Sequence, residues 1–230
     1  MRKITALLLL SLSILIAQNT NAQDIGVSAS FFLPKNGYFS APISPLSIRG
    51  VSLIGNGLFS IDIGGSLYRM SGMNITGVPF ESKEAMVGPF FNIMVPLEGV
   101  IHLGNSNTSI LFKGGGFAFY NLGTKLNYGN IDRALKKDLQ LDVANADFTF
   151  DNTIGYGYEF GIEYIQYLNR QFGITLGANY YIGGSNLNLK GNVKGYNAQG
   201  TMYDENVEYS NAKLDYTGLE ISVGVLFSSR

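Results

Sequence analysis

The pattern that most constrains the fold is an alternation of side-chain types, with a period of two, in residues 153–184. Successive side chains of a β-strand point to opposite faces, so this period predicts two strands joined by a tight turn at residues 169–171. One face is apolar and rich in aromatic residues, and the other is mostly small, polar or charged. The first face carries Tyr156, Tyr158, Phe160, Ile162, Tyr164, Phe172, Ile174, Leu176, Ala178, Tyr180 and Ile182, and the second carries Gly157, Glu159, Gly161, Glu163, Gly173, Thr175, Gly177, Asn179 and Tyr181.

The chemistry of the two faces indicates which one points outward. In a soluble barrel the apolar row would fill the interior, and Glu159 and Glu163 would face water. Glycine beside glutamate instead suits a narrow polar lumen, and a broad aromatic face suits lipid, as in transmembrane β-barrels. Only 14% of the residues are charged, against about a quarter in an average soluble domain. We therefore predict an all-β, antiparallel, up-and-down transmembrane β-barrel.

The same alternation predicts further strands at residues 24–32, 46–54, 58–70, 86–95, 108–120 and 213–227, which with the hairpin makes eight. The connections alternate between long and shorter segments, as in small outer-membrane barrels with long outer loops and short periplasmic turns. Ten strands are the alternative, if residues 139–151 or 191–203 form a further hairpin within the membrane. In the longest loop, residues 130–139 have apolar side chains at helical spacing, which predicts a short solvated helix.

Residues 1–22 have the features of a secretory signal peptide. Arg2 and Lys3 give a positive start, an apolar run follows at residues 4–17, and Thr20 and Ala22 are the small residues before the predicted cleavage site. The apolar run is too short to cross a bilayer as a helix, although a retained membrane anchor is the alternative. We divide the chain into a cleaved signal peptide, residues 1–22, and an outer-membrane β-barrel domain, residues 23–230.

Charged residues within the predicted strands constrain the interior. A Lys or Arg that faces lipid at mid-bilayer costs about 2–4 kcal/mol, so these charges should point inward. An eight-stranded barrel is just wide enough for side chains to fill it, so the charges must pair with one another. Lys113 is the natural centre, with Arg49 as a second cation, and we favour a structural polar plug over a gate or a proton path. The predicted network is Asp62, Lys113, Glu159, Glu163 and Glu220.

Aromatic residues near the predicted strand ends are candidates for the interfacial girdles of a membrane barrel. Ordinary packing between strands is the alternative, but the large number of tyrosines favours girdles. The candidates are Tyr68, Tyr120, Tyr156, Tyr167, Tyr180, Tyr181 and Phe227.

The sequence shows no catalytic or metal-binding constellation. His102 is the only histidine; we place it in the connection after the fourth strand, and neither Ser106 nor Ser109 is marked as a nucleophile for it. There is no cysteine, and no His, Asp and Glu residues have the spacing of metal ligands. A net charge of −1, without a basic run, does not indicate nucleic-acid binding. We predict no enzyme activity, no metal, no cofactor and no nucleic-acid partner.

Several segments of the chain resemble the small eight-stranded outer-membrane β-barrel family, of the OmpX-like and OmpA-membrane-domain-like kind. They are the strands YEFGIEYIQYL, FGITLGANYYIGG and GLEISVGVLF, and the signal ending Thr20-Asn21-Ala22. The resemblance is architectural and covers essentially the whole mature chain. It implies a Gram-negative outer-membrane location, insertion by the barrel-assembly machinery, contact with outer-membrane lipid and lipopolysaccharide, and a monomer. The chain departs from the family at its end, because Phe227 is followed by Ser228, Ser229 and Arg230.

The function expected from these features is structural, or a surface interaction through the long outer loops, with no particular ligand indicated. Three other classes stay open. A lipid-modifying outer-membrane enzyme would need an acid–base pair at the outer rim. A soluble lipocalin-like carrier would exchange the inner and outer faces, and a narrow passive pore would need an open lumen.

Overall fold

The computed structural model describes residues 25–37, 44–56 and 58–228. The predicted signal peptide and its cleavage site lie outside these ranges. Inside them, no helix has the length and apolar character that crossing a membrane requires.

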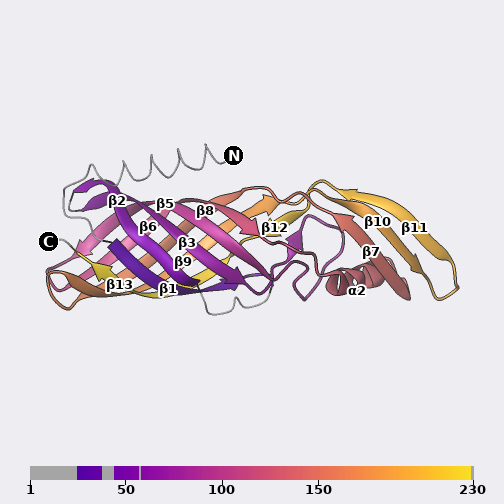
Figure 1. Ribbon diagram of the computed structural model, residues 1–230, viewed down its shortest axis with the longest axis horizontal. Helices are drawn as coiled ribbons and strands as arrows, with labels where there is room; N and C mark the ends of the chain where they lie inside the picture. Colours follow the sequence, from indigo (N-terminus) through magenta and orange to yellow (C-terminus); the bar gives the residue numbers. More distant parts are fainter. Residues whose placement is uncertain (1–24, 38–43, 57, 229–230) are drawn as a thin grey trace.

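Eight strands of the described residues close into an antiparallel barrel (Figure 1). Neighbours in sequence are neighbours in the sheet, and the last strand pairs with both the first strand and the seventh, which closes the ring. The predicted eight-stranded barrel is thereby confirmed. Its strands are β1 (Ile25–Pro34), β2 (Ser44–Asn56), β3 (Phe59–Met70), β5 (Phe90–Gly104), β6 (Thr108–Leu122), β8 (Gly155–Tyr167), β9 (Phe172–Asn186) and β13 (Gly218–Phe227).

The fourth barrel strand differs most from its prediction. β5 begins at Phe90 and continues to Gly104, whereas the sequence pattern predicted residues 86–95. The alternation of buried and exposed side chains continues past residue 95, because Pro96 removes only one backbone donor and leaves the side-chain alternation intact. Pairing with β6 continues to Gly104 opposite Ser109. The predicted medium connection is therefore a tight turn, in which the Asn105 side chain accepts hydrogen bonds from the backbone of Asn107 and Thr108.

The segments at the other end of the barrel fold into one extramembrane unit, which we call the head (Figure 1). Its three-stranded sheet has β10 in the middle, paired antiparallel with β7 and β11. The segments considered for a ninth and tenth barrel strand therefore contribute to this separate sheet. The head comprises β4 (Ile75–Thr76), α2 (Tyr128–Asp138), β7 (Val143–Thr149), β10 (Leu189–Tyr196), β11 (Met202–Tyr209), β12 (Lys213–Asp215) and the residues between them outside the barrel strands.

Helix α2 covers all but the last residue of the predicted helical segment, but it is not fully solvated. Its residues Ile131, Ala134 and Leu135 are buried in the head, as their helical spacing allows. Asp132 accepts a hydrogen bond from the backbone N–H of Ala146 in β7, at 2.8 Å. Burial raises the pKa of the Asp132 carboxyl above its ordinary value. The helix is thus attached to the sheet by both apolar and polar contacts.

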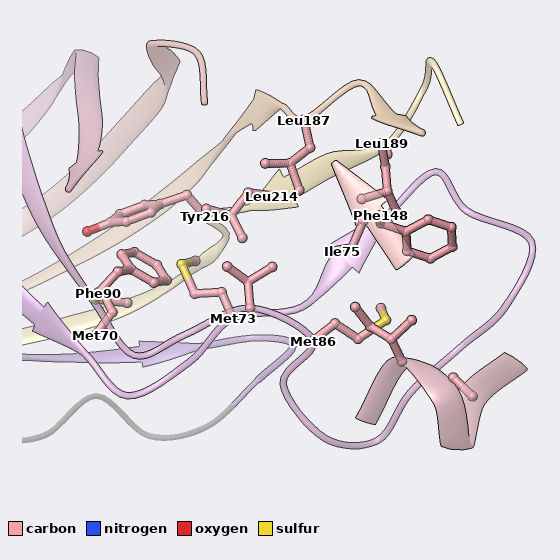
Figure 2. Close-up of a cluster of buried hydrophobic side chains, with 14 of the residues drawn as sticks. Met70, Met73, Ile75, Met86, Phe90, Phe148, Leu187, Leu189, Leu214 and Tyr216 are labelled. Carbon is pink, nitrogen blue, oxygen red and sulfur yellow. The ribbon is translucent and has the colours of Figure 1, made fainter. Parts of the chain in front are cut away.

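A single buried apolar cluster runs from the head into the mouth of the barrel (Figure 2). Leu189 and Phe148 belong to the head, and Tyr216 and Phe90 lie at the barrel end. Met73 is fully buried between the two groups. The backbone adds a second link, because β9 continues beyond the barrel and pairs with β12. Since this cluster would be exposed if the two parts separated, hydrophobic burial holds the head on the barrel.

Candidate functional site

The outside of the barrel is an apolar belt. Along each barrel strand, large apolar side chains at alternate positions are exposed, and the side chains between them are mostly buried. A belt of this extent on a closed sheet is the surface that lipid covers in an outer-membrane-type barrel. Its members include Val27, Ile48, Leu67, Ile93, Phe112, Phe160, Leu176 and Ile221.

The candidate site is the interior of this barrel, where the charged side chains gather. All five residues of the predicted network are buried there, with exposed fractions no higher than the 8% of Glu163. The structure divides them into two ion-paired groups and two further carboxylates. Arg49, expected as a second cation, is buried as well, and the structure adds Glu98.

The first group is centred on Glu220 of β13, whose side chain is completely buried. Its carboxylate forms an ion pair with Arg49 of β2. Tyr68 donates a hydrogen bond to the same carboxylate, and Tyr181 donates another, at 2.8 Å. Two charge-assisted hydrogen bonds and one ion pair satisfy a charge that burial would otherwise strongly disfavour.

The second group is centred on Lys113 of β6. Its ammonium forms an ion pair with Glu163 of β8 and lies 3.9 Å from a carboxylate oxygen of Glu98 on β5. These three side chains come from three consecutive barrel strands, so the group joins the strands across the lumen side of the sheet.

The interior contains more acids than bases. Five carboxylates and two cations are buried among the described residues, an excess of three acids. Asp62 lies directly opposite Glu98 on the neighbouring strand. Both carboxylate oxygens of Glu159 are buried without a hydrogen-bond partner among the described residues. Asp62 and Glu159 are also outside the ion pairs of the described part, so the predicted network is two paired groups beside two carboxylates that no cation holds.

An aromatic layer closes the interior at the end next to the head. Tyr216 stacks against Phe32 with ring centroids 4.6 Å apart, and it lies 4.6 Å from Phe119. Tyr181 meets Phe117 edge to face at 5.0 Å. Tyr181 and Tyr68 are only 1% exposed, so their prediction as girdle residues is wrong. Their inward parity, rather than their residue type, decides where they lie.

An aliphatic layer closes the opposite end, next to the short turns. It consists of the buried side chains Val100, Leu111, Ile165 and Leu226, with Tyr167 packed against them. The charged groups therefore lie between two apolar layers. Buried apolar side chains of the described residues thus occupy the lumen at both ends.

His102 lies in β5 and not in a connection, because that strand is longer than predicted. It is near the short-turn end, as predicted, and its Nε2 is 2.7 Å from Oγ of Ser60 on β3. Histidine and serine at this separation have the geometry of a base and a nucleophile. Among the described residues, no group of three or more His, Cys, Asp or Glu side chains is arranged to hold a metal ion.

Two members of the interior groups escaped the sequence prediction for different reasons. Glu98 was assigned to a connection, although continuing the alternation of β5 through Pro96 would have placed it on the inner face. Tyr68 has the same parity in β3 as Asp62, so the alternation already placed its side chain on the inner face. Its role as a donor to Glu220 depends on a partner 152 residues away, which no local pattern reveals.

No protein-family model and no curated protein matches the chain. Its structure is similar to that of a major outer membrane protein from Thermus thermophilus, with 10% identity, a TM-score of 0.45, and coverage of 90% of this chain and 99% of that one. It is also similar to OprG from Pseudomonas aeruginosa, with 8% identity, a TM-score of 0.43, and coverage of 90% of this chain and 92% of that one. A third similar structure is the outer membrane protease OmpT from Escherichia coli, with 8% identity, a TM-score of 0.35, and coverage of 90% of this chain and 94% of that one.

Proposed function

We propose that this chain is an integral outer-membrane barrel without enzymatic activity, which presents its head to a partner outside the cell. The short turns would face the periplasm and the head would face outward, following the usual orientation of such barrels. The observation that carries the proposal is the packing of the head: one apolar cluster connects it to a barrel whose interior is filled.

The alternatives fit these observations less well. A passive pore needs a continuous aqueous path, whereas side chains fill both ends of this interior. A lipocalin-like carrier needs an apolar cavity inside and a polar exterior, which is the reverse of the observed distribution. A filled barrel with a rigid outer unit is suited to holding a binding surface at a fixed position above the membrane.

The best candidate for that surface is the end of the head sheet, which we call the tip. Tyr196 of β10 lies opposite Val143 of β7 and Met202 of β11 in one cross-strand row. All three are exposed, Val143 to 57%, Tyr196 to 49% and Met202 to 55%. Tyrosine and methionine are enriched in protein interfaces, and the rest of this sheet face is polar, with Asn192 and Lys194 in the adjoining rows.

A test compares cells that display the wild-type protein with cells that display the triple variant Val143→Ser, Tyr196→Ser and Met202→Ser. We expect adhesion to host-cell or bacterial surfaces to fall with the variant at an unchanged surface amount. A matched control replaces Val95, Leu97 and Ile93 with alanine in the lipid belt, which should leave adhesion unchanged. Equal adhesion by both proteins and by cells lacking the protein would contradict the proposal. Wild-type protein in planar bilayers should give no conductance.

One observation favours a second candidate, an acyl-ester hydrolase at the periplasmic side. The pair of Ser60 and His102 lies beside an open surface hollow of roughly 560 Å³ that Ser60, Phe59 and Ile101 help to line. In this proposal His102 would accept the Ser60 proton as the hydroxyl attacks the ester carbon. Labelling of the folded protein by a fluorophosphonate, lost in Ser60→Ala but kept in Ser106→Ala, would favour the hydrolase. No labelling would leave the non-enzymatic proposal standing.

A further inference from the structure

A groove of roughly 290 Å³ lies on the outer side of the barrel, where it meets the head. It forms where β9 changes partners. Along one edge β9 pairs with β8 as far as Gly184, and along the other edge it pairs with β13 as far as Tyr181 and then with β12 from Gly184 onward. Gly183 and Gly184 line the groove, and Gly184, at an outward position of β9, has no side chain to fill it. The start of β8 forms one wall, and β12 with the residues after it forms the other.

The two walls differ in chemistry. Ile154, Tyr156 and Ile182 line the apolar wall, and they are exposed to 65%, 74% and 48%. Tyr156 and Ile182 occupy outward positions on β8 and β9, so this wall continues the belt of apolar side chains that lipid covers. Lys213, Asp215 and Thr217 line the polar wall, on the side of the head.

The polar wall carries one exposed cation, Lys213, and one carboxylate, Asp215, whose two oxygens are held by neighbouring donors. Both oxygens of the Asp215 carboxylate are already engaged: Asn36 donates a hydrogen bond of 2.9 Å to one, and the backbone N–H of Thr217 donates one of 3.1 Å to the other. Lys213 is exposed, and its ammonium takes part in none of the ion pairs of the described residues. The groove thus combines an apolar wall at the level of the membrane with an unpaired cation directly above it.

We propose that this groove binds one membrane lipid with a phosphate-bearing anionic headgroup. The acyl chains would lie along Tyr156 and Ile182, and the Lys213 ammonium would contact the phosphate. The apolar wall suits an occupant with hydrocarbon chains, and the exposed Lys213 ammonium, which no ion pair of the described residues holds, complements an anionic head at its height. The occupant would come from the leaflet on the side of the head. This proposal is independent of what the tip of the head binds.

The test uses the absence of tryptophan from the chain. Tyr156→Trp places a single tryptophan in the groove, and Tyr164→Trp places one at the far end of the same strand, at another outward position. Each protein is reconstituted in vesicles of phosphatidylcholine with a minor fraction of phosphatidylglycerol, and bromine is attached to the chains of one lipid or the other at equal total bromine. We expect brominated phosphatidylglycerol to quench the tryptophan of Tyr156→Trp more strongly, and the two lipids to quench that of Tyr164→Trp equally.

Adding Lys213→Gln to Tyr156→Trp should weaken the preference for phosphatidylglycerol about fivefold, the effect of one basic residue near a membrane surface. Lys213→Arg should preserve the preference. Lys190→Gln, on the outer face of the head sheet, should also leave it unchanged. Each variant is first shown to be folded by its change in gel mobility on boiling.

Three results would overturn the site. The first is equal quenching of the groove tryptophan by both lipids. The second is a preference that Lys213→Gln leaves unchanged. The third is the same preference in Tyr156→Trp and Tyr164→Trp, since general attraction of anionic lipid would explain it. None of these results depends on adhesion, so failure here and failure of the proposed function are distinguishable.

Discussion

The ion pair between Arg49 and Glu220 should be essential to the stability of the barrel. Glu220 is fully buried, and apolar layers lie at both ends of the interior. Replacing Arg49 with methionine therefore leaves a carboxylate that water does not readily reach. Removal of one partner from a buried ion pair typically costs about 3–5 kcal/mol. Because Tyr68 and Tyr181 still donate to Glu220, we expect Arg49→Met to lower the free energy of unfolding by about 3 kcal/mol.

The free energy of unfolding is measured by urea titration in lipid vesicles, with the folded fraction read from gel mobility without boiling and from far-UV circular dichroism. The double variant Arg49→Met with Glu220→Gln removes both charges and keeps an oxygen acceptor for the tyrosines. We expect it to be about 2 kcal/mol more stable than Arg49→Met alone, because interacting residues are not additive. This recovery distinguishes an uncompensated charge from a simple loss of packing.

A matched control is the surface pair of Lys194 and Asp204, whose atoms are 3.6 Å apart and whose side chains are 60% and 41% exposed. Lys194→Met should cost less than about 1 kcal/mol, since water screens an exposed pair. The reasoning is refuted if Arg49→Met costs no more than this control. It is also refuted if Glu220→Gln gives no recovery, because the cost would then not come from the unpaired carboxylate.

Three further predictions concern single groups. Tyr181→Phe removes one donor to Glu220 and should lower the unfolding free energy by about 1–3 kcal/mol, whereas Tyr180→Phe, at a half-exposed position beside it, should change it little in the same titration. Leu189→Ala creates a cavity in the core of the head and should destabilise the head by about 2–5 kcal/mol; proteolysis within α2 should become faster while the barrel keeps its heat-dependent gel mobility, and unchanged proteolysis would refute the packing. Asp132→Asn keeps an acceptor for the Ala146 N–H but cannot titrate. Because the pKa of Asp132 is raised in the folded head, its stabilising contribution is complete below the pKa of the unfolded chain and is lost as the pH rises through the raised value. When the pH is lowered from neutral to about 4, the thermal midpoint of the wild-type head should therefore rise more than that of Asp132→Asn. Equal changes in the two midpoints would contradict the raised pKa of Asp132.

The barrel was largely predictable because its signal is local. An alternation with a period of two does not depend on which strand pairs with which. The two faces of β8 also differ so clearly in polarity that the sequence shows which face is inside and which is outside. The same parity identified the inward side of Asp62, Lys113 and Glu220. Predictions failed where residue type was given more weight than parity, as for Tyr68 and Tyr181, or where the alternation of β5 was not followed beyond residue 95.

The sequence by itself determined the class of fold and the direction in which the charges of the barrel strands point, because both depend on neighbours two residues apart. Only the tertiary structure decided that Arg49 pairs with Glu220 across 171 residues, and that residues 143–149 and 189–209 form one sheet outside the membrane. Only packing showed that apolar layers close both ends of the interior. Such contacts join distant segments, and the pattern within a strand gives its face but not the side chain that it meets.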